Sequence, residues 1–534
     1  MSTADCIPIA AAPGLSRLFL DFCAGTDSTR RFYAPSSAAE WQRRPAVPPH
    51  WPELVEQLAA QNPGPERAAA LDSLGRGAGV IVTGQQVGLF GGPLYTPFKA
   101  ATAIARARQS SEAGHPHAAV FWLASEDHDF AEINHVTFPS RRELRKLVYP
   151  AVPEAARPVG SIVLDESVDP LIEQAWELLG ASDAMDALAE AYKPGRTFAQ
   201  AFAAFYAKVF AAQGLLIIDA ASRGIHRLGA PVLQAAIERA DELHAALMAR
   251  NSELESAGYH AQVALAPQSS LLFVLDAQSG ARVALKRIAP TAGEPAGLWQ
   301  AGRQRYATAD LVGILAAEPE RISPAALLRP VFQDYLLSTS LTIGGPAEIA
   351  YFAQSAVLFE KILGRKTPVH PRLSATLIEP AIAELLRKHD LSPERVFSET
   401  EESLAQRLAA RAIPIEGKRK LASAGNALDG ELQDVLDWMR NLDAGLGRSA
   451  ETAASKMRYQ MNRLRRLAAN FQLQREASLA RHAEAIVRAL YPERNLQERV
   501  HGAAYYFARQ GFELAEQLCS TAAKLCPGHA ILPL

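Results

Sequence analysis

The most polar stretch of this chain carries the side chains best suited to move a proton. Four acids and two histidines fall within the eleven residues from 125 to 135, namely Glu126, Asp127, His128, Asp129, Glu132 and His135. A carboxylate or an imidazole can act as a general base, and a second carboxylate can orient it or hold an ammonium group. We predict that Asp127, His128 and Asp129 are catalytic and that Glu126, Asn134 and His135 contact substrate.

Two other interpretations of this stretch remain open. His128 and His135 could ligate a metal ion, although their spacing matches no standard site. Alternatively, the stretch is a solvated loop in which aspartates cap turns. Its position favours function, because it follows an apolar run at 118–123 that predicts a buried strand, and ligands in open α/β sheets bind at the carboxyl ends of strands.

A glycine-rich loop is the second candidate site. Residues 84–92 read GQQVGLFGG and follow a short apolar run at 80–82. The loop is not a Walker motif, because no Gly-Lys-Ser/Thr follows it, and it is not GxGxxG. A helical pattern comes next, from about 95 to 108. Either Pro93 stands at its first position or Thr96 is its N-cap.

We predict that this loop and the helix after it bind substrate. An anion should lie within hydrogen-bonding reach of the 88–93 backbone amides, because glycines allow close approach and a helix N-terminus attracts anions. The alternative is a tight turn whose glycines serve packing alone. The binding candidates here are Gln85, Gln86, Gly88, Gly91, Gly92, Tyr95 and Lys99.

The elements around both loops predict an α/β fold. Strand, glycine loop, helix and strand form one βαβ unit from 79 to 136. Apolar runs at 215–219 and 338–343, with a last short one before His370, bring the parallel strands to five. Five such strands with helices between them make a doubly wound sheet.

Two segments interrupt the predicted sheet. Residues 137–195 and 252–330 look like insertions, and the second contains a predicted β-hairpin of 270–275 and 282–287.

One long helix is predicted over 225–251. Three further substrate-binding candidates follow strands of the sheet, namely Gly345, Glu348 and Arg372.

The C-terminal part changes to a coiled-coil pattern. Apolar residues recur at spacings of three, four or seven, and they are Leu432, Leu436, Met439, Leu446, Ala453, Met457, Leu464, Ala468 and Phe471. The pattern predicts one helix over about 430–490, roughly 90 Å long. A Ser398–Glu401 capping box predicts a shorter antiparallel helix before Pro414. This helix cannot cover the whole stripe, so we predict a homodimer joined through the 430–490 helices.

The length of the chain, 534 residues, is too great for one core. We divide it into a lead-in packed on the core, a Rossmann-like core, a helical coiled-coil domain and a segment that folds back on the core. These predicted parts are 1–78, 79–380, 381–491 and 492–534.

Composition and charge exclude several classes of protein. The formal net charge of −2 lacks the basic excess of a nucleic-acid binder. No apolar run reaches the ~18 residues of a membrane span, and the N-terminus lacks a signal peptide. Cys6, Cys23, Cys519 and Cys526 form no CxxC pair, which indicates neither a zinc ribbon nor a disulfide framework. We expect a cytoplasmic protein.

Five strings of sequence resemble the cysteine ligase family of bacillithiol biosynthesis, the BshC family. They are VTGQQVGLFGGPLYTPFK (82–99), FWLASEDHDFAEINHV (121–136), IGGPAEIAYFAQ (343–354), VHPRLSATLIEP (369–380) and LQERVHGAAYYFARQG (496–511). The resemblance implies a nucleotidylyltransferase-like Rossmann fold, although the HxGH signature of those enzymes is absent. It also implies the last step of bacillithiol biosynthesis, in which L-cysteine is joined through an amide bond to the amino group of glucosaminyl-malate.

This chemistry implies roles for the candidate residues. The sugar amine must be neutral to attack, so His128 or Asp127 would act as base. Lys99, Arg372 and the glycine amides would bind the malate carboxylates, and Asp129 or Glu126 the cysteine ammonium. The resemblance also implies an adenine nucleotide (ATP or ADP), for which we name Gln497, Arg499, Tyr505 and Tyr506, and no metal is evident.

Two other functions stay open from the sequence. One is a coiled-coil dimer that binds a nucleotide or metabolite without chemistry, and the polar loop argues against it. The other is a nucleotidylyltransferase-like enzyme, against which the missing HxGH signature speaks.

Overall fold

The computed structural model describes residues 6–140, 142–150, 155–288 and 297–534. The chain forms two compact units. The first holds 1–140, 144–376 and 498–532, and the second holds 141–143, 377–497 and 533–534. The predicted lead-in and both predicted insertions contain residues outside the described ranges.

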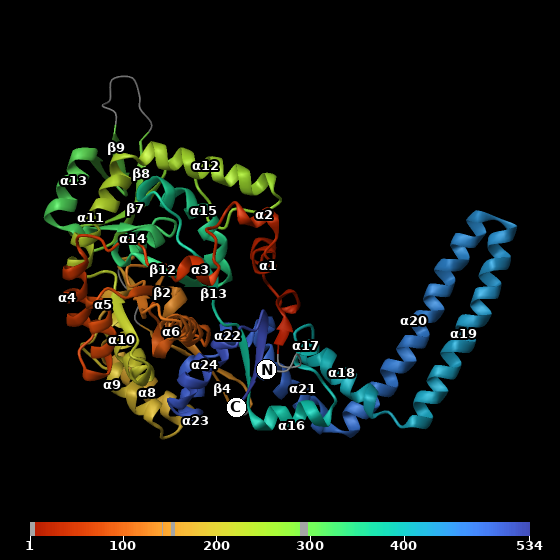
Figure 1. Ribbon diagram of the computed structural model, residues 1–534. Coiled ribbons are helices and arrows are strands. Elements are labelled where there is room, and N and C mark those ends of the chain that lie inside the picture. Colours follow the sequence, from red (N-terminus) through yellow and green to blue (C-terminus); the bar gives the residue numbers. More distant parts are fainter. Residues whose placement is uncertain (1–5, 141, 151–154, 289–296) are drawn as a thin grey trace. The chain divides into compact units, whose positions relative to one another are not determined.

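A five-stranded parallel sheet lies at the centre of the first unit (Figure 1). In chain order its strands are β2 (Gly79–Gln85), β3 (His117–Leu123), β6 (Leu216–Asp219), β12 (Thr339–Gly344) and β13 (Val369–Pro371), and in space they follow the order β13-β12-β2-β3-β6. All four pairings are parallel. The strands β3 and β12 are buried throughout, which explains their continuous apolar runs. The predicted sheet of five parallel strands is confirmed.

Helices connect and cover these strands. They are α6 (Tyr95–Glu112), α10 (Phe198–Val209), α11 (Arg223–Glu238), α12 (Ala240–Ser256), α14 (Arg329–Leu337) and α15 (Pro346–Leu363). The helix predicted from about 95 is confirmed as α6, but Pro93 is not its first residue and Thr96 is not its N-cap, because α6 begins at Tyr95 with Leu94 as its N-cap. Pro97 therefore stands in the first turn, where its missing N–H costs no intrahelical hydrogen bond.

The single helix predicted over 225–251 is wrong. The structure has α11 and α12 instead, which meet at Arg239. The guanidinium of Arg239 donates to the carboxylate of Glu242 and to the backbone carbonyl of Lys361, and these contacts fix the junction.

Smaller elements surround the sheet. Before it come β1 (Cys6–Pro8), α1 (Arg17–Cys23), α2 (Asp27–Arg30), α3 (Ala38–Trp41), α4 (Trp51–Gln61) and α5 (Ala68–Gly75). The first predicted insertion contains an antiparallel pair and two helices, namely β4 (His135–Pro139), β5 (Leu144–Val148), α8 (Asp169–Leu179) and α9 (Asp183–Ala191), and α7 (Phe130–Ile133) precedes it.

The second predicted insertion contains a five-stranded sheet of order β10-β9-β8-β7-β11. Its elements are β7 (Ser269–Leu275), β8 (Arg282–Arg287), β9 (Leu298–Ala301), β10 (Gln304–Ala307), α13 (Thr308–Ala317) and β11 (Ile322–Pro324). The predicted hairpin is confirmed as the antiparallel pair β7 and β8.

The last part of the chain contributes α22 (Gln497–Val500), α23 (Ala503–Gln510), α24 (Glu513–Ala523) and β15 (Gly528–Pro533). Helix α24 packs along α6, where the guanidinium of Arg106 donates to the carbonyl of Ala522 over 2.9 Å. No helix in the described ranges is both long enough and apolar enough to cross a membrane.

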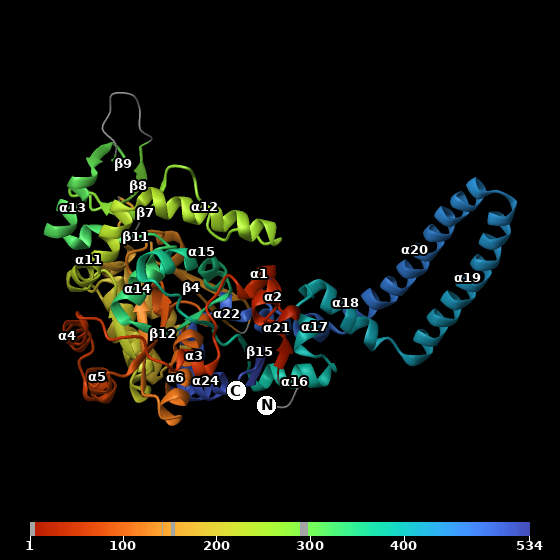
Figure 2. The ribbon, with the colours of Figure 1, turned by 45° about the horizontal axis from the view of Figure 1, so that its top comes forward.

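The second unit is helical. Its helices are α16 (Pro380–Lys388), α17 (Pro393–Val396), α18 (Glu401–Ala412), α19 (Ile415–Leu442), α20 (Ala444–Arg475) and α21 (Ala477–Leu490). Figures 1 and 2 show α19 and α20 side by side. The ion pairs Arg440–Glu451 and Asp429–Arg458 show that they run antiparallel, because a lower residue number on α19 is paired with a higher one on α20. We call α19 and α20 the hairpin.

Two predictions about these helices are wrong. The single helix predicted over 430–490 breaks at Asp443 and Glu476. The Asp443 carboxylate accepts from the backbone amides of Gly445 and Leu446 and so caps α20. Helix α18 is capped by Thr400 with Ser403 rather than by Ser398 with Glu401.

The buried seam of the hairpin differs from the predicted seam. On α20 the hairpin buries Gly447, Ala454 and Met461, which are seven residues apart, and the two smallest of these let the helices approach closely. Four of the larger residues of the predicted seam are instead solvent-exposed, namely Leu446, Met457, Leu464 and Phe471, at 42 to 62 %. We call these four residues the outer stripe.

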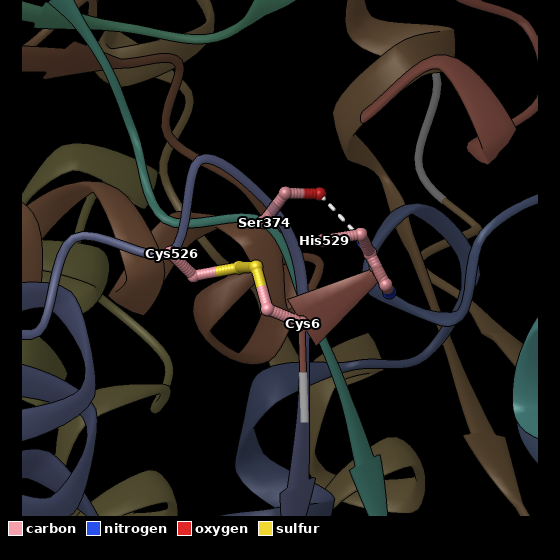
Figure 3. Close-up of a disulfide and its surroundings, with 4 residues drawn as sticks. All are labelled: Cys6, Ser374, Cys526 and His529. Atoms are coloured by element: carbon pink, nitrogen blue, oxygen red, sulfur yellow. Dashed lines mark hydrogen bonds between the residues drawn. A yellow bond between two sulfur atoms is a disulfide. The ribbon is translucent and has the colours of Figure 1, made fainter. Parts of the chain in front are cut away.

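A disulfide joins Cys6 to Cys526 (Figure 3). The expectation that the cysteines form no disulfide is therefore wrong. The two residues are 520 positions apart and meet because β1 pairs with β15, so no local spacing could reveal them. Cys23 and Cys519 are free thiols.

Candidate active site

A cavity of about 370 Å³ opens at the carboxyl ends of β2, β3 and β12. Strand β2 lies between β3 and β12, so the order of strands reverses there, and open α/β sheets bind ligands at such a switch point. The volume suits a small ligand. The strands contribute Gly84, Gln85, Trp122, Thr342 and Ile343 to its walls.

The structure brings together part of the set predicted from the sequence. The predicted residues that line the cavity are Gln85, Gln86, Tyr95, Lys99, Asp127, Gly345, Glu348, Arg372 and Arg499. Those outside its lining are Gly88, Gly91, Gly92, Glu126, His128, Asp129, Asn134, His135, Gln497, Tyr505 and Tyr506. Lining residues that we did not name as site residues include Glu132, Arg329, Gln333 and Tyr351.

Lys99 is buried against the glycine loop. Its ammonium donates to the carbonyl of Gly84 (2.8 Å) and to Oε1 of Gln85 (2.9 Å), and it lies 2.6 Å from Oε2 of Glu348. The same oxygen of Glu348 accepts from the amide of Gly345 at the start of α15. Burial lowers the pKa of Lys99, and Glu348 opposes that shift. The protein itself therefore compensates the charge of Lys99.

Arg372 brings a second cation to the cavity. Its guanidinium donates to Glu498 over 2.6 Å, and both side chains are almost completely buried. Oε2 of Glu498 also accepts from the hydroxyl of Ser374 and the amide of Ala375. Arg372 lies 5.3 Å from the centre of the Tyr95 ring. Its Nη1 also donates to the carbonyl of Leu373, so the protein holds both ends of the guanidinium of Arg372 at the cavity wall.

Asp127 is the catalytic candidate that reaches the cavity. Burial alone would raise its pKa, but Arg329, 3.6 Å away, and the backbone amide of His128 lower it below its usual range. Glu132 lines the same cavity, and its pKa is raised by burial and by the neighbouring Asp129 and Asp127. The site thus contains one carboxylate that stays ionised and one that holds a proton more readily.

His128 contacts Arg282 and does not line the cavity. Nη1 of Arg282 lies 3.2 Å from Nδ1 of His128, and the guanidinium stacks on Phe273. An arginine can only donate, so Nδ1 accepts and a neutral His128 carries its proton on Nε2. Burial, followed by the charge of Arg282, lowers the pKa of His128. His128 lies outside the cavity lining and is not placed as the base.

The other polar residues of this loop hold the loop in shape. Glu126 is buried 2.7 Å from Nε2 of the buried His226, and the charge of Glu126 raises the pKa of His226 against the effect of burial. Asp129 caps α7 by accepting from the amide of Glu132. Oδ1 of Asn134 lies 3.2 Å from Nδ1 of His135.

The glycine loop uses its polar groups within the protein. The amide of Gly91 donates to the hydroxyl of Tyr192, which itself donates to the carbonyl of Gly88, and the hydroxyl of Tyr206 donates to the carbonyl of Gly91. Gly91 has φ +81°, and a side chain there would collide with Phe205. The amide of Gly92 donates to Leu89. These amides are already engaged, so the predicted anion has poorer access to them.

The four residues named for an adenine nucleotide do not form one site. Gln497 bonds the backbone of Leu377 and Ala489 within the second unit. Tyr505 and Tyr506 are buried, and the Tyr506 hydroxyl bonds Nδ1 of His501. Only Arg499 of this set lines the cavity. The set does not fit a nucleotide, and we derive no step through one.

Family models match nearly the whole chain. The model described as "Bacillithiol biosynthesis BshC, N-terminal Rossmann-like domain" matches residues 2–373. The model described as "Bacillithiol biosynthesis BshC, C-terminal coiled-coil domain" matches residues 375–534. The chain belongs to the BshC family. This confirms the resemblance found in the five sequence strings.

Relatives in the BshC family align over almost the full length. A protein of Koribacter versatilis (strain Ellin345) is 41 % identical, and one of Solibacter usitatus (strain Ellin6076) is 34 % identical, each over 99 % of both chains. A protein of Salinibacter ruber is 29 % identical over 96 % of this chain and 95 % of its own. All three carry the name "Putative cysteine ligase BshC".

Arg329 is the cavity residue of this BshC chain that sequence reasoning missed most clearly. It begins α14, about 200 residues after Asp127, and it follows neither a glycine loop nor a strand of the parallel sheet. Its Nε is buried and has no hydrogen-bond partner in the described part of the chain. The metal alternative gains no support, because the described residues hold no cluster of three or more His, Cys, Asp or Glu placed for a metal ion.

Proposed function

We propose that this chain joins the carboxyl group of L-cysteine to the amino group of glucosaminyl-malate through an amide bond. Membership of the BshC family, with relatives named as cysteine ligases, supports the reaction class. The observation that carries the proposal is the cavity at the switch point of the sheet, where four cations and three carboxylates converge. These are Lys99, Arg329, Arg372 and Arg499, with Asp127, Glu132 and Glu348.

The cations differ in how free they are to bind a substrate anion. Glu348 pairs with Lys99 and Glu498 with Arg372. Arg499 is exposed and makes no ion pair within the described ranges, and Arg329 holds Asp127 only at 3.6 Å. Arginine binds carboxylates in bidentate fashion. We therefore propose that Arg499 and Arg329 bind the two malate carboxylates. Arg372 also lines the cavity.

The carboxylates suit the amine that attacks. A sugar amine enters as an ammonium ion and must lose a proton before it can attack a carbonyl carbon. Asp127 stays ionised and can attract and orient the ammonium group, whereas the raised pKa of Glu132 makes it the better proton acceptor. The cysteine carboxyl also needs activation, and ATP or ADP as its source remains a prediction. A cytoplasmic location likewise remains a prediction.

The test is mass spectrometry of low-molecular-weight thiols in the host strain. Removal of the gene should abolish the cysteine-containing thiol and accumulate glucosaminyl-malate, and the wild-type gene should reverse both changes. The Arg499→Gln variant should restore less than a tenth of the thiol and leave the precursor high, because a carboxylate contact is lost, whereas Arg499→Lys should restore more. An unchanged thiol profile after gene removal would refute the proposal.

We also propose that the chain is a homodimer through the outer stripe of α20. Leu464 and Phe471 are 54 % and 62 % exposed and lie seven residues apart, so they share one face of the helix. Exposed apolar residues also lie on α19, where Trp438 and Leu442 are 60 % and 59 % exposed. Large apolar side chains left exposed in such number mark association sites.

The dimer proposal has a matched test. Leu464→Glu combined with Phe471→Glu should shift the protein from dimer to monomer in sedimentation at micromolar concentration, because two charges would enter the apolar contact. Ser455→Glu combined with Asn470→Glu adds the same charge at exposed positions of the same helix that lie away from the outer stripe, and should leave the dimer intact. A wild-type monomer, or a dimer that survives the first pair of substitutions, would contradict the proposal.

A further inference from the structure

Strand β1 is held by a short pairing, one buried side chain and a disulfide. Strand β1 is three residues long, and its partners on β15 are Ala530, His529 and Gly528. Its third residue, Pro8, has no N–H to donate to the ladder. The Cys6–Cys526 bridge crosses this short pairing, and both cysteines are partly exposed to solvent. Without the bridge, only this three-residue pairing and the buried side chain of Ile7 would keep β1 in place.

Strand β15 leads to the candidate active site through buried polar contacts. The ring of His529 lies 2.8 Å from the hydroxyl of Ser374 and 2.8 Å from that of Thr376 (Figure 3 shows the first contact). The hydroxyl of Ser374 lies 3.1 Å from Oε2 of Glu498, whose other oxygen accepts from Arg372. We call these residues the column, namely His529, Ser374, Glu498 and Arg372.

The fit between β1 and β15 is close enough to protect the column. His529 is completely buried, and it faces Ile7 in the pairing of the two strands. A side chain at Gly528 would collide with the carbonyl oxygen of Ile7, so the strands meet backbone to backbone. Loss of β1 would expose the backbone edge of β15 beside His529 to water.

We propose that the Cys6–Cys526 bridge undergoes thiol–disulfide exchange with low-molecular-weight thiols. Reduction of the bridge would make the hydrogen-bonded residues of the column, which include Arg372, less rigid. A small thiolate attacks one sulfur of the bridge, the S–S bond breaks, and the released cysteine sulfur takes a proton. A second small thiol attacks the mixed disulfide and releases the other cysteine as a thiol. Two small thiols are oxidised to one small disulfide, and the bridge is reduced to two cysteines.

The chemistry of the other cysteines separates them from this site. Burial raises the pKa of the Cys23 thiol and of the Cys519 thiol to about 12 each, so neither is a thiolate at neutral pH. A response to a small thiol can therefore be assigned to Cys6 and Cys526. The inference rests on the proposed function only in that Arg372 is taken as part of the substrate site.

The experiment uses the full chain in L-cysteine/cystine buffers of increasing reducing strength. Alkylation and mass spectrometry should show one Cys6–Cys526 link converting to two free thiols. Hydrogen exchange should then speed up at least tenfold for amides of 528–532 and 374–376, and the affinity for L-malate, used as a probe, should fall severalfold. The Cys6→Ser variant should show fast amide hydrogen exchange even when no small thiol is added. The Cys23→Ala, Cys519→Ala double variant should respond to the buffers like the wild type.

Two outcomes would overturn the inference. One is the absence of the Cys6–Cys526 link after incubation with excess cystine. The other is an exchange rate at 374–376 that stays the same in the linked and the reduced protein. If L-malate fails to bind the disulfide-linked protein while hydrogen exchange responds as expected, the proposed substrate site is wrong. The proposal for the Cys6–Cys526 disulfide would then still hold.

Discussion

Replacement of Glu498 by glutamine should destabilise the first unit by about 3–5 kcal/mol. Glu498 and Arg372 are almost completely buried and 2.6 Å apart, so loss of the negative charge leaves a guanidinium without its partner in a poorly solvated place. Urea unfolding followed by circular dichroism gives the change in free energy. Glu384→Gln is the matched control, because Glu384 pairs with Arg387 at the same 2.6 Å but both are exposed. We expect at most about 1 kcal/mol there.

The same pair predicts how the difference depends on pH. Burial alone would raise the pKa of Glu498, but Arg372 outweighs burial and lowers it. A carboxyl whose pKa is lower in the folded state stabilises the protein above its unfolded pKa, about 4.3, and loses that contribution as pH falls through the folded pKa. The gap between wild type and Glu498→Gln should therefore shrink below about pH 4. A gap that persists unchanged there would show that charge pairing is not its cause.

Asp127→Asn should lower the rate of thiol formation by about 10²-fold, because a poorly positioned amine reacts that much more slowly. Asparagine keeps the shape of the side chain but has no charge with which to attract and orient the ammonium group that gives its proton to Glu132. The measurement is thiol production by the purified protein, with thermal unfolding to show that the fold is kept. Asp129→Asn makes the same change two residues away, at a cap outside the cavity, and should cost no more than several-fold. Equal losses in the two variants would remove Asp127 from the mechanism.

The position of the candidate site could be predicted because it depends on the sheet. Strands buried on both sides must be apolar throughout, so β2, β3 and β12 are visible as apolar runs, and their carboxyl ends must meet. The directions of the side chains could not be predicted in the same way. Asp127 and His128 are neighbours in sequence, yet one lines the cavity and the other faces Arg282.

Contacts between distant segments account for the other errors at the site. The glycine loop looked open to a ligand, but Tyr192 from the first predicted insertion and Tyr206 from α10 occupy its polar groups. Arg329 reaches Asp127 from a helix about 200 residues later. The Cys6–Cys526 bridge depends on a pairing of the two ends of the chain. None of these contacts leaves a periodic or local pattern in the sequence.

Periodicity identified the helical region but not the hairpin, because it predicted one continuous helix across the turn at Asp443. Two sets of residues recur every seven positions on α20, namely Gly447, Ala454 and Met461 inside the hairpin and Met457, Leu464 and Phe471 on its surface. The larger set looked like the seam because coiled coils usually bury large side chains. In the hairpin the set with Gly447 and Ala454 is inside, where the small side chains let the helices approach closely.

The regular spacing of the buried hairpin positions has a consequence for its length. Gly447, Ala454 and Met461 recur every seven residues, so removal of seven residues from each helix would leave the remaining contacts in register. Each such step would shorten the hairpin by about 10 Å, whereas removal of four or five residues would rotate one helix face away from the other. The length of the hairpin can thus be changed in fixed increments by such deletions. The Stokes radius of the deletion variants would measure each increment.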